Sequence, residues 1–305
     1  MEPSLVAFVI LNWNGREYTP SCLDSLSQAG VDFSQITVVD NHSEDGSYEY
    51  LLENYPTIDL VRNSSNLGFT GGNNVGIRKA LEKGYEYVFL LNNDTEVRPD
   101  FLHFLVEEME TSQETAAIQP LIYYLKDRLK VWNAGGVYNS RLSLSQTVYQ
   151  PKSLNASYET DWITGCAIMV RAAVIREVGL LDEKYFAYFE DVDWSLRMRK
   201  AGYRLKVHPN AVIYHEAGAS SKTKKADKEG FLNPKVHYLN VRNQIYQIKK
   251  HADLPARIVS WPLHFFRFGL IALYFLIRGR KSKLAAIIKG MRDGLRTGTF
   301  QNYPL

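Results

Sequence analysis

The segment YVFLLNNDTEV, residues 87–97, places a run of largely apolar side chains directly before two asparagines and an aspartate. A run without polar alternation predicts a strand buried on both faces. Asn92, Asn93 and Asp94 end that strand, and such groups are costly to bury unpaired. We therefore expect a polar ligand to meet them at the strand end.

The same pattern recurs along the first hundred residues. Strands are predicted at 5–11, 35–40, 58–62 and 87–91, each buried on both faces, with helical segments between them. This alternation is typical of an α/β fold, with a single, mostly parallel, Rossmann-like sheet flanked by helices.

Polar clusters follow all four strands, at residues 12–15, 40–43, 63–66 and 92–94. Ligands of open α/β sheets bind outside the carboxyl ends of the strands, so we expect the clusters to line one cleft. The alternative is that each cluster only caps the following helix, but a cap needs a single such residue.

The third connection, residues 63–76, contains four glycines and four asparagines. Glycine lets the backbone approach a ligand, and a helix N-terminus supplies N–H groups that suit a phosphate. Neither the dinucleotide fingerprint nor the P-loop spacing is present, which sets aside NAD-dependent enzymes and P-loop NTPases.

The second half of the chain is less regular. A helix is predicted at 100–111, and a strand that leads into a helix at 162–179. The irregular region between them, to about residue 158, contains hairpin signals, and we expect it to form one wall of the binding site. Within this last segment, Gly165 and Cys166 are small enough to lie under a ligand.

Three carboxylates, Glu190, Asp191 and Asp193, begin a helix within the aromatic-rich segment 185–203. Their role could be purely structural, because acidic residues in the first turn interact favourably with the helix dipole, by about 0.3–1 kcal/mol each. Aromatic neighbours would instead raise a carboxyl pKa, which suits a general base. Helical spacing predicts that Glu190 and Asp193 share a face and that Asp191 points elsewhere.

Two strands are predicted in residues 203–215, the second ending at His215. A histidine there is more often a satisfied polar residue, but it is also a suitable second ligand for a cation held by one carboxylate. Residues 218–230 predict a mobile loop that closes over a bound substrate.

The C-terminal tail is basic. Residues 249–305 have a net charge of 11 − 2 = +9, and residues 1–248 one of 25 − 31 = −6. An anionic membrane fits such a tail; nucleic acid would also fit by charge, but no recognition module accompanies it. The apolar run 268–277 is short of the roughly twenty residues that span a bilayer. We expect a helix lying in the interface, against the alternatives of packing on the catalytic domain or a homodimer contact.

Two cysteines cannot form a disulfide framework, and no signal-peptide pattern opens the chain. These features predict a reducing cytosol, with the tail peripheral at the inner face of the cell membrane.

Together the motifs resemble those of family 2 glycosyltransferases of the GT-A fold, in particular rhamnosyltransferase-like enzymes. The resemblance covers residues 5–250 and rests on several ordered motifs, VILNWNG, VVDNHSEDGS, NLGFTGGNNVG, LLNNDTEV, GCAIMVR, YFEDVDWSLRMRKAGY, VIYHEAGASS and YLNVRN.

The resemblance implies Asp191 as the catalytic base, with Asp94 and His215 as ligands of Mg²⁺ or Mn²⁺. The sequence departs from the family's Asp-x-Asp at Asn92, which adds no charge and makes strict metal dependence less certain. A donor site for a dTDP- or UDP-linked sugar is assigned to Asn12, Asp40, Asn41, Ser43, Asn66, Gly68, Phe69, Asn73, Asn92, Asn93 and Arg242. The acceptor site is assigned to Trp162, Gly165, Cys166 and Glu190.

One base and one leaving-group site imply a single displacement, hence an inverting glycosyltransferase. Rhamnose transfer to a glycan or lipid-linked acceptor, in cell-surface polysaccharide synthesis, is expected by resemblance. The predicted domains are a catalytic unit at 1–250, with a nucleotide-sugar half to about residue 100, and a helical tail at 251–305. The alternative is a non-catalytic sugar-nucleotide or glycan-binding module; a nucleotidyltransferase would need a lysine-bearing signature near the first strand, which is missing.

Overall fold

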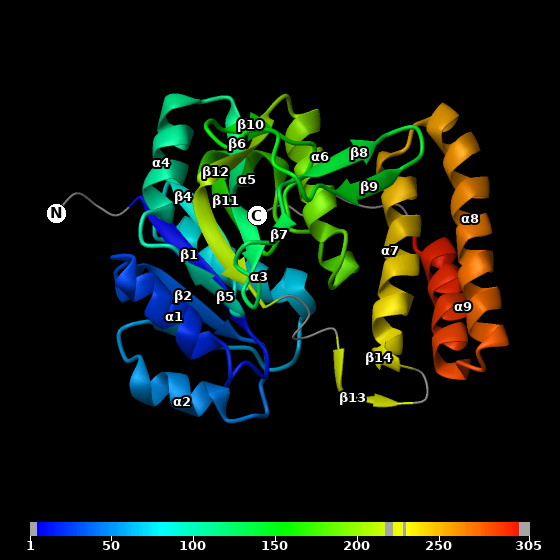
Figure 1. Ribbon diagram of the computed structural model, residues 1–305, viewed down its shortest axis with the longest axis horizontal. Helices are drawn as coiled ribbons and strands as arrows, with labels where there is room; N and C mark the ends of the chain where they lie inside the picture. Colours follow the sequence, from blue (N-terminus) through cyan, green and yellow to red (C-terminus); the bar gives the residue numbers. More distant parts are fainter. Residues whose placement is uncertain (1–4, 217–221, 228–229, 299–305) are drawn as a thin grey trace.

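The computed structural model describes residues 5–216, 222–227 and 230–298. A ten-stranded mixed sheet forms its centre, in the order β10-β12-β6-β11-β4-β1-β2-β3, with β5 paired to β12 and β7 to β6 (Figure 1). Its strands are β1 (Val6–Asn12), β2 (Ile36–Asp40), β3 (Asp59–Arg62), β4 (Tyr87–Asn92), β5 (Thr95–Val97), β6 (Thr115–Tyr124), β7 (Val131–Asn133), β10 (Tyr158–Glu159), β11 (Ala167–Arg171) and β12 (Arg204–His215).

Helices cover both faces of the sheet, because alternate side chains of its strands point to opposite sides. Phe8 of β1 belongs to a core shared with α1 (Thr19–Gln28), α2 (Ser47–Asn54) and α4 (Phe101–Thr111). Its neighbour Val9 packs into the opposite core, which contains residues of α3 (Gly68–Glu82), α5 (Ala172–Val178) and α6 (Glu190–Lys200). The predicted α/β class is confirmed.

Strand direction brings distant parts of the chain to one edge. Strands β1 to β4 are parallel, as predicted, and β11 is antiparallel to both β4 and β6. β12 is parallel to β6, so β6 and β12 run in the same direction as β4. The polar ends of β1, β2 and β4 therefore lie on the same edge as His215, the last residue of β12.

Three strand predictions need correction. β3 lies at the sheet edge and is only partly buried, not buried on both faces. Residues 203–215 form one strand, whose register shifts between His208 and Val212, and not two. The irregular region contains β6, most of which is buried. Pro120 argues against a central strand in the sequence, because proline cannot donate a backbone hydrogen bond. In the structure β11 pairs with β6 only at Ala117 and Ile118, so Pro120 lies outside the β6–β11 pairing.

Two hairpins lie outside the main sheet. β8 (Gly136–Asn139) pairs with β9 (Leu144–Thr147), where hairpin signals were predicted. β13 (Lys222–Asp227) pairs with β14 (Gly230–Leu232), so part of the predicted loop is a strand. Residues 218–221 and 228–229 of that loop lie outside the described residues.

The terminal helices α7 (Pro234–His251), α8 (Leu254–Ile277) and α9 (Lys281–Arg296) form a bundle beside the sheet (Figure 1). Side chains of Asn233 and Asp253 cap α7 and α8. A Cβ on Gly290 of α9 would lie 2.8 Å from the Tyr238 carbonyl oxygen of α7, so this glycine permits a close helix contact. The helical extension is confirmed; a domain boundary at residue 250 stays a prediction.

Candidate active site

The ends of β1 and β2 are joined by side chains predicted to bind the donor. Asn12 Nδ2 donates to Asp40 Oδ1 at 2.8 Å, to Ser43 Oγ at 3.1 Å and to Ser47 Oγ at 2.9 Å. Asn12, Asp40 and Ser43 are buried. The structure brings these residues together at the ends of β1 and β2; direct contact with a nucleoside stays a prediction.

Asn41 organises the start of α3. Its Nδ2 donates to Asn66 Oδ1 and to the Gly68 carbonyl oxygen, both at 3.1 Å. Gly68 has φ +74°, and a Cβ there would lie 2.5 Å from the Phe186 carbonyl oxygen, so the position requires glycine. Asn73, in contrast, donates within its own helix to the Phe69 carbonyl oxygen at 2.8 Å.

Two other glycines of this segment serve packing. A Cβ on Gly72 or Gly76 would lie 2.3 Å from a side-chain carbon of Leu11 or Val9, respectively. These glycines therefore allow α3 to lie directly on β1. Two of the four glycines in residues 63–76 therefore serve helix–strand packing and do not offer their backbone to a phosphate.

Asp94 and His215 face one another across the β5–β12 pair. Asp94 Oδ1 lies 3.2 Å from His215 Nε2, and both side chains are nearly buried. Within residues 5–216, 222–227 and 230–298, neither Asp94 Oδ1 nor His215 Nδ1 has a hydrogen-bond partner. Trp132 packs its ring edge-to-face on His215 at 4.3 Å.

These two side chains fit a divalent cation, because a carboxylate oxygen without a partner and an imidazole nitrogen are suitable ligands. No group of three or more His, Cys, Asp and Glu residues is arranged to hold a metal ion in the described part of the chain. The protein would therefore supply two ligands. Asn93 donates through Nδ2 to Thr19 Oγ1 at 2.8 Å, which holds the strand end against α1.

The predicted base Asp191 lies on the other side of the cleft. The Gly165 N–H donates to its Oδ2 at 3.0 Å, and the Val192 N–H donates to its Oδ1 at 2.8 Å. The adjacent carbonyl oxygen of Cys166 accepts from the Asn92 N–H at 2.8 Å. Residues 165 and 166 therefore connect the base to the end of β4. Burial raises the pKa of Asp191, and these backbone bonds oppose that rise.

Glu190 is buried beside Asp191, and its Oε2 has no hydrogen-bond partner among the described residues. Burial, and then the charge of Asp191, raise the pKa of Glu190 well above its ordinary value. Neighbouring carboxyls with different environments separate into an acid and a base. The backbone N–H bonds to Asp191 oppose the rise of its pKa, so Asp191 is the more readily ionised carboxyl of the pair.

Both carboxyls line a pocket of about 380 Å³. Six of its fourteen lining residues are aromatic, among them Trp162, whose Nε1 has no partner in the described ranges. Such a wall suits a sugar ring, which presents apolar C–H faces between its hydroxyls. The residues lining it are Tyr124, Trp132, Asn133, Ser145, Thr147, Tyr149, Trp162, Thr164, Tyr188, Phe189, Glu190, Asp191, Val192 and Asn240.

The predicted grouping of the three carboxylates is wrong. Glu190 and Asp191 face the same pocket, whereas Asp193 is fully buried against α7. Asp193 lies 2.9 Å from Arg197 Nε, 2.9 Å from Lys250 Nζ and 2.7 Å from His251 Nε2. Burial opposes ionisation of Asp193, but the charge of Arg197, the hydrogen bond with His251 and the charge of Lys250 outweigh it and hold the pKa of Asp193 well below its ordinary value. Asp193 therefore serves stability.

The segment before Asp191 has an unusual backbone. Phe186, Tyr188 and Phe189 all have positive φ, a conformation that costs about 1–3 kcal/mol for each non-glycine residue. The Ala187 N–H donates to the Tyr185 carbonyl oxygen at 2.8 Å, which closes a strained γ-turn at Phe186. No local sequence signal predicts this conformation, because none of the three residues is Gly, Asn or Asp.

Arg242 reaches this segment from α7. Its Nη2 donates to the carbonyl oxygens of Lys184 at 3.0 Å and Tyr185 at 2.6 Å. The predicted contact with phosphate would compete with these bonds and stays a prediction. The next residue, Asn243, also bonds to the segment, and sequence reasoning missed it although it belongs to the YLNVRN motif.

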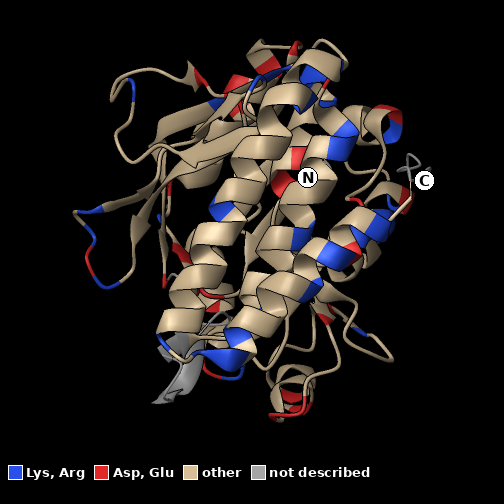
Figure 2. Ribbon diagram, turned by 90° about the vertical axis from the view of Figure 1, so that its right-hand side faces the viewer, with Lys and Arg blue, Asp and Glu red and all other residues tan. Residues whose placement is uncertain are grey.

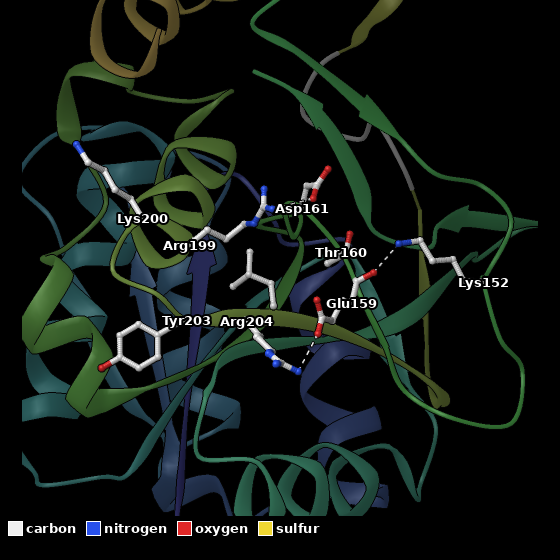
Figure 3. A pocket seen from close by; sticks show the side chains of 9 residues that line it. Lys152, Glu159, Thr160, Asp161, Arg199, Lys200, Tyr203 and Arg204 are labelled. Carbon is white, nitrogen blue, oxygen red and sulfur yellow. Dashed lines mark hydrogen bonds and ion pairs between the residues drawn. The ribbon is translucent and has the colours of Figure 1, made fainter. Parts of the chain in front are cut away.

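A second pocket, of about 500 Å³, lies at the starting end of β12, the opposite sheet edge from His215 (Figure 3). Arg199 lies 3.1 Å from Asp161, and Arg204 lies 3.1 Å from Glu159. This pocket is larger, but both of its carboxylates are engaged in ion pairs and it contains none of the predicted site residues. The aromatic pocket at Asp191 is therefore the candidate active site.

Related sequences support an assignment to a family. The profile of the family described as "Glycosyl transferase family 2" matches residues 7–179. The chain is 26% identical over 228 residues to an N-acetylglucosaminyl-diphospho-decaprenol L-rhamnosyltransferase of Mycobacterium tuberculosis, covering 65% of this chain and 72% of the relative. It is 24% identical over 265 residues to the dTDP-rhamnosyl transferase RfbF of Shigella flexneri, covering 86% of each.

Solved structures share the fold at low sequence identity. GalNAc-T7 with UDP, GalNAc and Mn²⁺ matches with a TM-score of 0.60 and 17% identity, over 88% of this chain and 54% of that one. The mannosyltransferase PcManGT of Pyrobaculum calidifontis, with GDP-Man and Mn²⁺, matches with a TM-score of 0.57 and 14% identity, over 96% and 87%. The fold is thus of the GT-A type, as predicted. With a matching profile over more than half its length, the chain belongs to glycosyl transferase family 2 and is a glycosyltransferase.

Proposed function

We propose that this glycosyltransferase moves rhamnose, with inversion, from a dTDP-linked donor to a hydroxyl of a lipid-linked glycan. The observation that carries the proposal is the placement of Asp191, held by the Gly165 N–H, in a pocket that also contains the buried Glu190. The two relatives named for rhamnosyl transfer, one dTDP-linked and one acting on a diphospho-decaprenol glycan, support the choice of donor and acceptor.

The reaction is a single displacement. The acceptor oxygen forms a bond to the anomeric carbon while the bond from that carbon to the diphosphate oxygen breaks. The acceptor proton passes to a carboxylate oxygen of Asp191, and the nucleoside diphosphate departs with the bonding electrons. Glu190, in its protonated form, donates a hydrogen bond to an acceptor oxygen and so orients the ring.

The donor diphosphate needs positive charge as it departs. Asp94 and His215 would hold a divalent cation, which supplies that charge when bound. Two relatives by fold were solved with Mn²⁺, which supports a divalent cation but does not distinguish Mn²⁺ from Mg²⁺. Asn92 adds no charge at this site, so a loosely held cation is consistent with the residues present.

We further propose that α8 and α9 place the enzyme on the cytoplasmic face of an anionic membrane. Along α8, Ser260, His264, Phe268 and Phe275 form a buried stripe against the rest of the protein. The opposite face is apolar and uncovered: Phe266 is 67% exposed, Leu273 51% and Ile277 75%. Basic residues outnumber acidic ones along the bundle, which faces the viewer in Figure 2.

By length and composition α8 is also able to cross a membrane, since it has 24 residues and a mean hydropathy of 1.4 in its best window. Crossing would require its buried stripe to leave the protein. In that stripe the His264 ring nitrogen bonds to the Leu142 carbonyl oxygen at 3.0 Å, and Ser260 Oγ donates to the Arg141 carbonyl oxygen at 3.1 Å. These contacts favour a helix that lies in the interface.

The donor is tested by incubating the purified full chain with dTDP-rhamnose, UDP-GlcNAc or GDP-mannose and a polyprenyl-diphosphate glycan. We expect product only from dTDP-rhamnose, with inverted anomeric configuration by NMR, and a turnover lowered by about two to four orders of magnitude in Asp191→Asn. Transfer from another donor would replace rhamnose in the proposal. Donor binding by calorimetry without turnover on any acceptor would instead support a non-catalytic binding module.

A further inference from the structure

Asn243 of α7 holds the backbone that leads into Asp191. It is fully buried, and the two hydrogens of its Nδ2 are shared among three carbonyl oxygens, those of Tyr185 at 3.0 Å, Ala187 at 2.8 Å and Tyr188 at 2.7 Å. Arg242 Nε donates to Asn243 Oδ1 at 2.9 Å, which orients the amide with its hydrogens toward the three carbonyls. One side chain thus serves three residues of the strained segment.

The opposite side of the segment rests on the start of α3. The Thr70 N–H donates to the Phe186 carbonyl oxygen at 3.2 Å, and Gly68 allows the close approach described above. Residues 185–189 are therefore clamped between α3, in the predicted donor half, and α7. A backbone with three positive-φ residues persists only where its surroundings hold it, and Asn243 makes the largest number of those bonds from a single side chain.

We propose that Asn243 is a positioning residue for the reaction, which fixes residues 185–189 and thereby the place of Asp191 in the pocket. This inference rests on the proposed role of Asp191. Asn243 has no exposed surface, so it acts through the backbone and not through the substrate. Loss of its bonds would let the segment relax from positive φ and move the carboxylate away from the acceptor oxygen, and small displacements of a reacting group reduce turnover strongly.

Asn74 provides a matched control. It is also a fully buried asparagine, and it also bonds to distant backbone: its Nδ2 donates to the Leu181 carbonyl oxygen at 2.9 Å, and its Oδ1 accepts from the Leu181 N–H at 3.1 Å. Its bonds end before the positive-φ segment. A purely structural asparagine in this fold should therefore behave like Asn74.

The test compares Asn243→Ala with Asn74→Ala in the full chain. We expect Asn243→Ala to lower kcat by about 10- to 100-fold while the donor KM stays within about threefold. Asn74→Ala should lower Tm but leave kcat of the folded protein near that of the wild type. Equal effects of the two variants on kcat would overturn the proposal.

A second readout does not depend on turnover. Amide hydrogen exchange of a peptide covering residues 185–192 should speed up about tenfold or more in Asn243→Ala and stay unchanged in Asn74→Ala. If the wild type transfers no sugar, the proposed function fails, but hydrogen exchange still tests whether Asn243 holds residues 185–189. Unchanged exchange in Asn243→Ala would refute the proposed role of Asn243. Should Asn243→Ala not fold, Asn243→Ser, which keeps one donor, is measured against the same criteria.

Discussion

The Gly165 N–H donates to Asp191 Oδ2 at 3.0 Å, and this bond joins the two halves of the candidate site. Gly165 precedes Cys166, whose carbonyl oxygen accepts from Asn92 at the end of β4. The carboxylate on the acceptor side is therefore tied to the strand that ends two residues before the predicted cation ligand Asp94.

Asp191→Asn should lower kcat by about two to four orders of magnitude with little change in donor affinity, because the general base is lost. The same substitution two residues away provides the control. Asp193→Asn should instead cost about 3–5 kcal/mol of stability, because it leaves the nearly buried Arg197 without its anion, whereas Lys250 keeps Asp182 at 2.7 Å. Turnover assays and chemical unfolding separate the two effects; near-normal turnover of Asp191→Asn would remove this residue from the mechanism.

The rate should fall on the acid side as Asp191 takes up a proton. Burial raises its pKa, so this fall should lie at higher pH than for an ordinary aspartate, whose pKa is about 3.9. Glu190→Gln should keep the acid limb, since a neutral amide resembles the protonated acid. Loss of the limb in Glu190→Gln would mean that Glu190, and not Asp191, is the titrating base.

Stability should depend on pH through Glu190. A raised pKa in the folded state means that the native protein binds this proton more tightly than the unfolded chain does. The wild type therefore loses stability as pH rises above the unfolded value of about 4.3. Glu190→Gln removes that loss, so its Tm should exceed that of the wild type at neutral pH and match it more closely near pH 4. An equal or lower Tm at neutral pH would contradict this assignment.

Asp94→Ala should abolish any stimulation by Mn²⁺ or Mg²⁺ and lower kcat/KM by at least about 100-fold, the loss expected when a departing diphosphate is no longer neutralised. Asp100→Ala, an exposed carboxylate that pairs with Arg98, is the matched control and should retain stimulation. Donor affinity with and without cation is measured by calorimetry. Full activity of chelator-treated wild type would rule out the metal assignments of Asp94 and His215.

The wild type should co-float with anionic liposomes and be released as salt rises. The double variant Phe266→Asp, Leu273→Asp should stay unbound, since losing two apolar anchors costs about 3 kcal/mol or more, over 100-fold in partitioning. Leu129→Asp changes a residue that is 93% exposed on another surface and should float normally. If alkaline carbonate does not extract the wild type from the liposomes, α8 spans the membrane. If the wild type does not float, the exposed face of α8 contacts another protein instead.

The sequence alone determined the parallel half of the sheet and the clustering of polar side chains at its edge. Continuous apolar runs report burial on both faces, and the residues that end a strand are local to it. For this reason Asn12, Asp40 and Asn92 could be assigned to one cleft before any coordinates were known. The family motifs also identified Asp94, Asp191 and His215 as one set, and the fold places Asp94 and His215 within 3.2 Å.

Only the tertiary structure decided what these side chains face. Helical spacing paired Glu190 with Asp193, but Asp193 instead bonds to Lys250 and His251 of α7, partners that are distant in sequence. The positive φ values of Phe186, Tyr188 and Phe189 have no local cause, because they depend on hydrogen bonds from Asn243, which lies more than fifty residues along the chain. The periodicity of a sequence indicates whether a side chain is buried. Only the tertiary structure shows which group that side chain contacts.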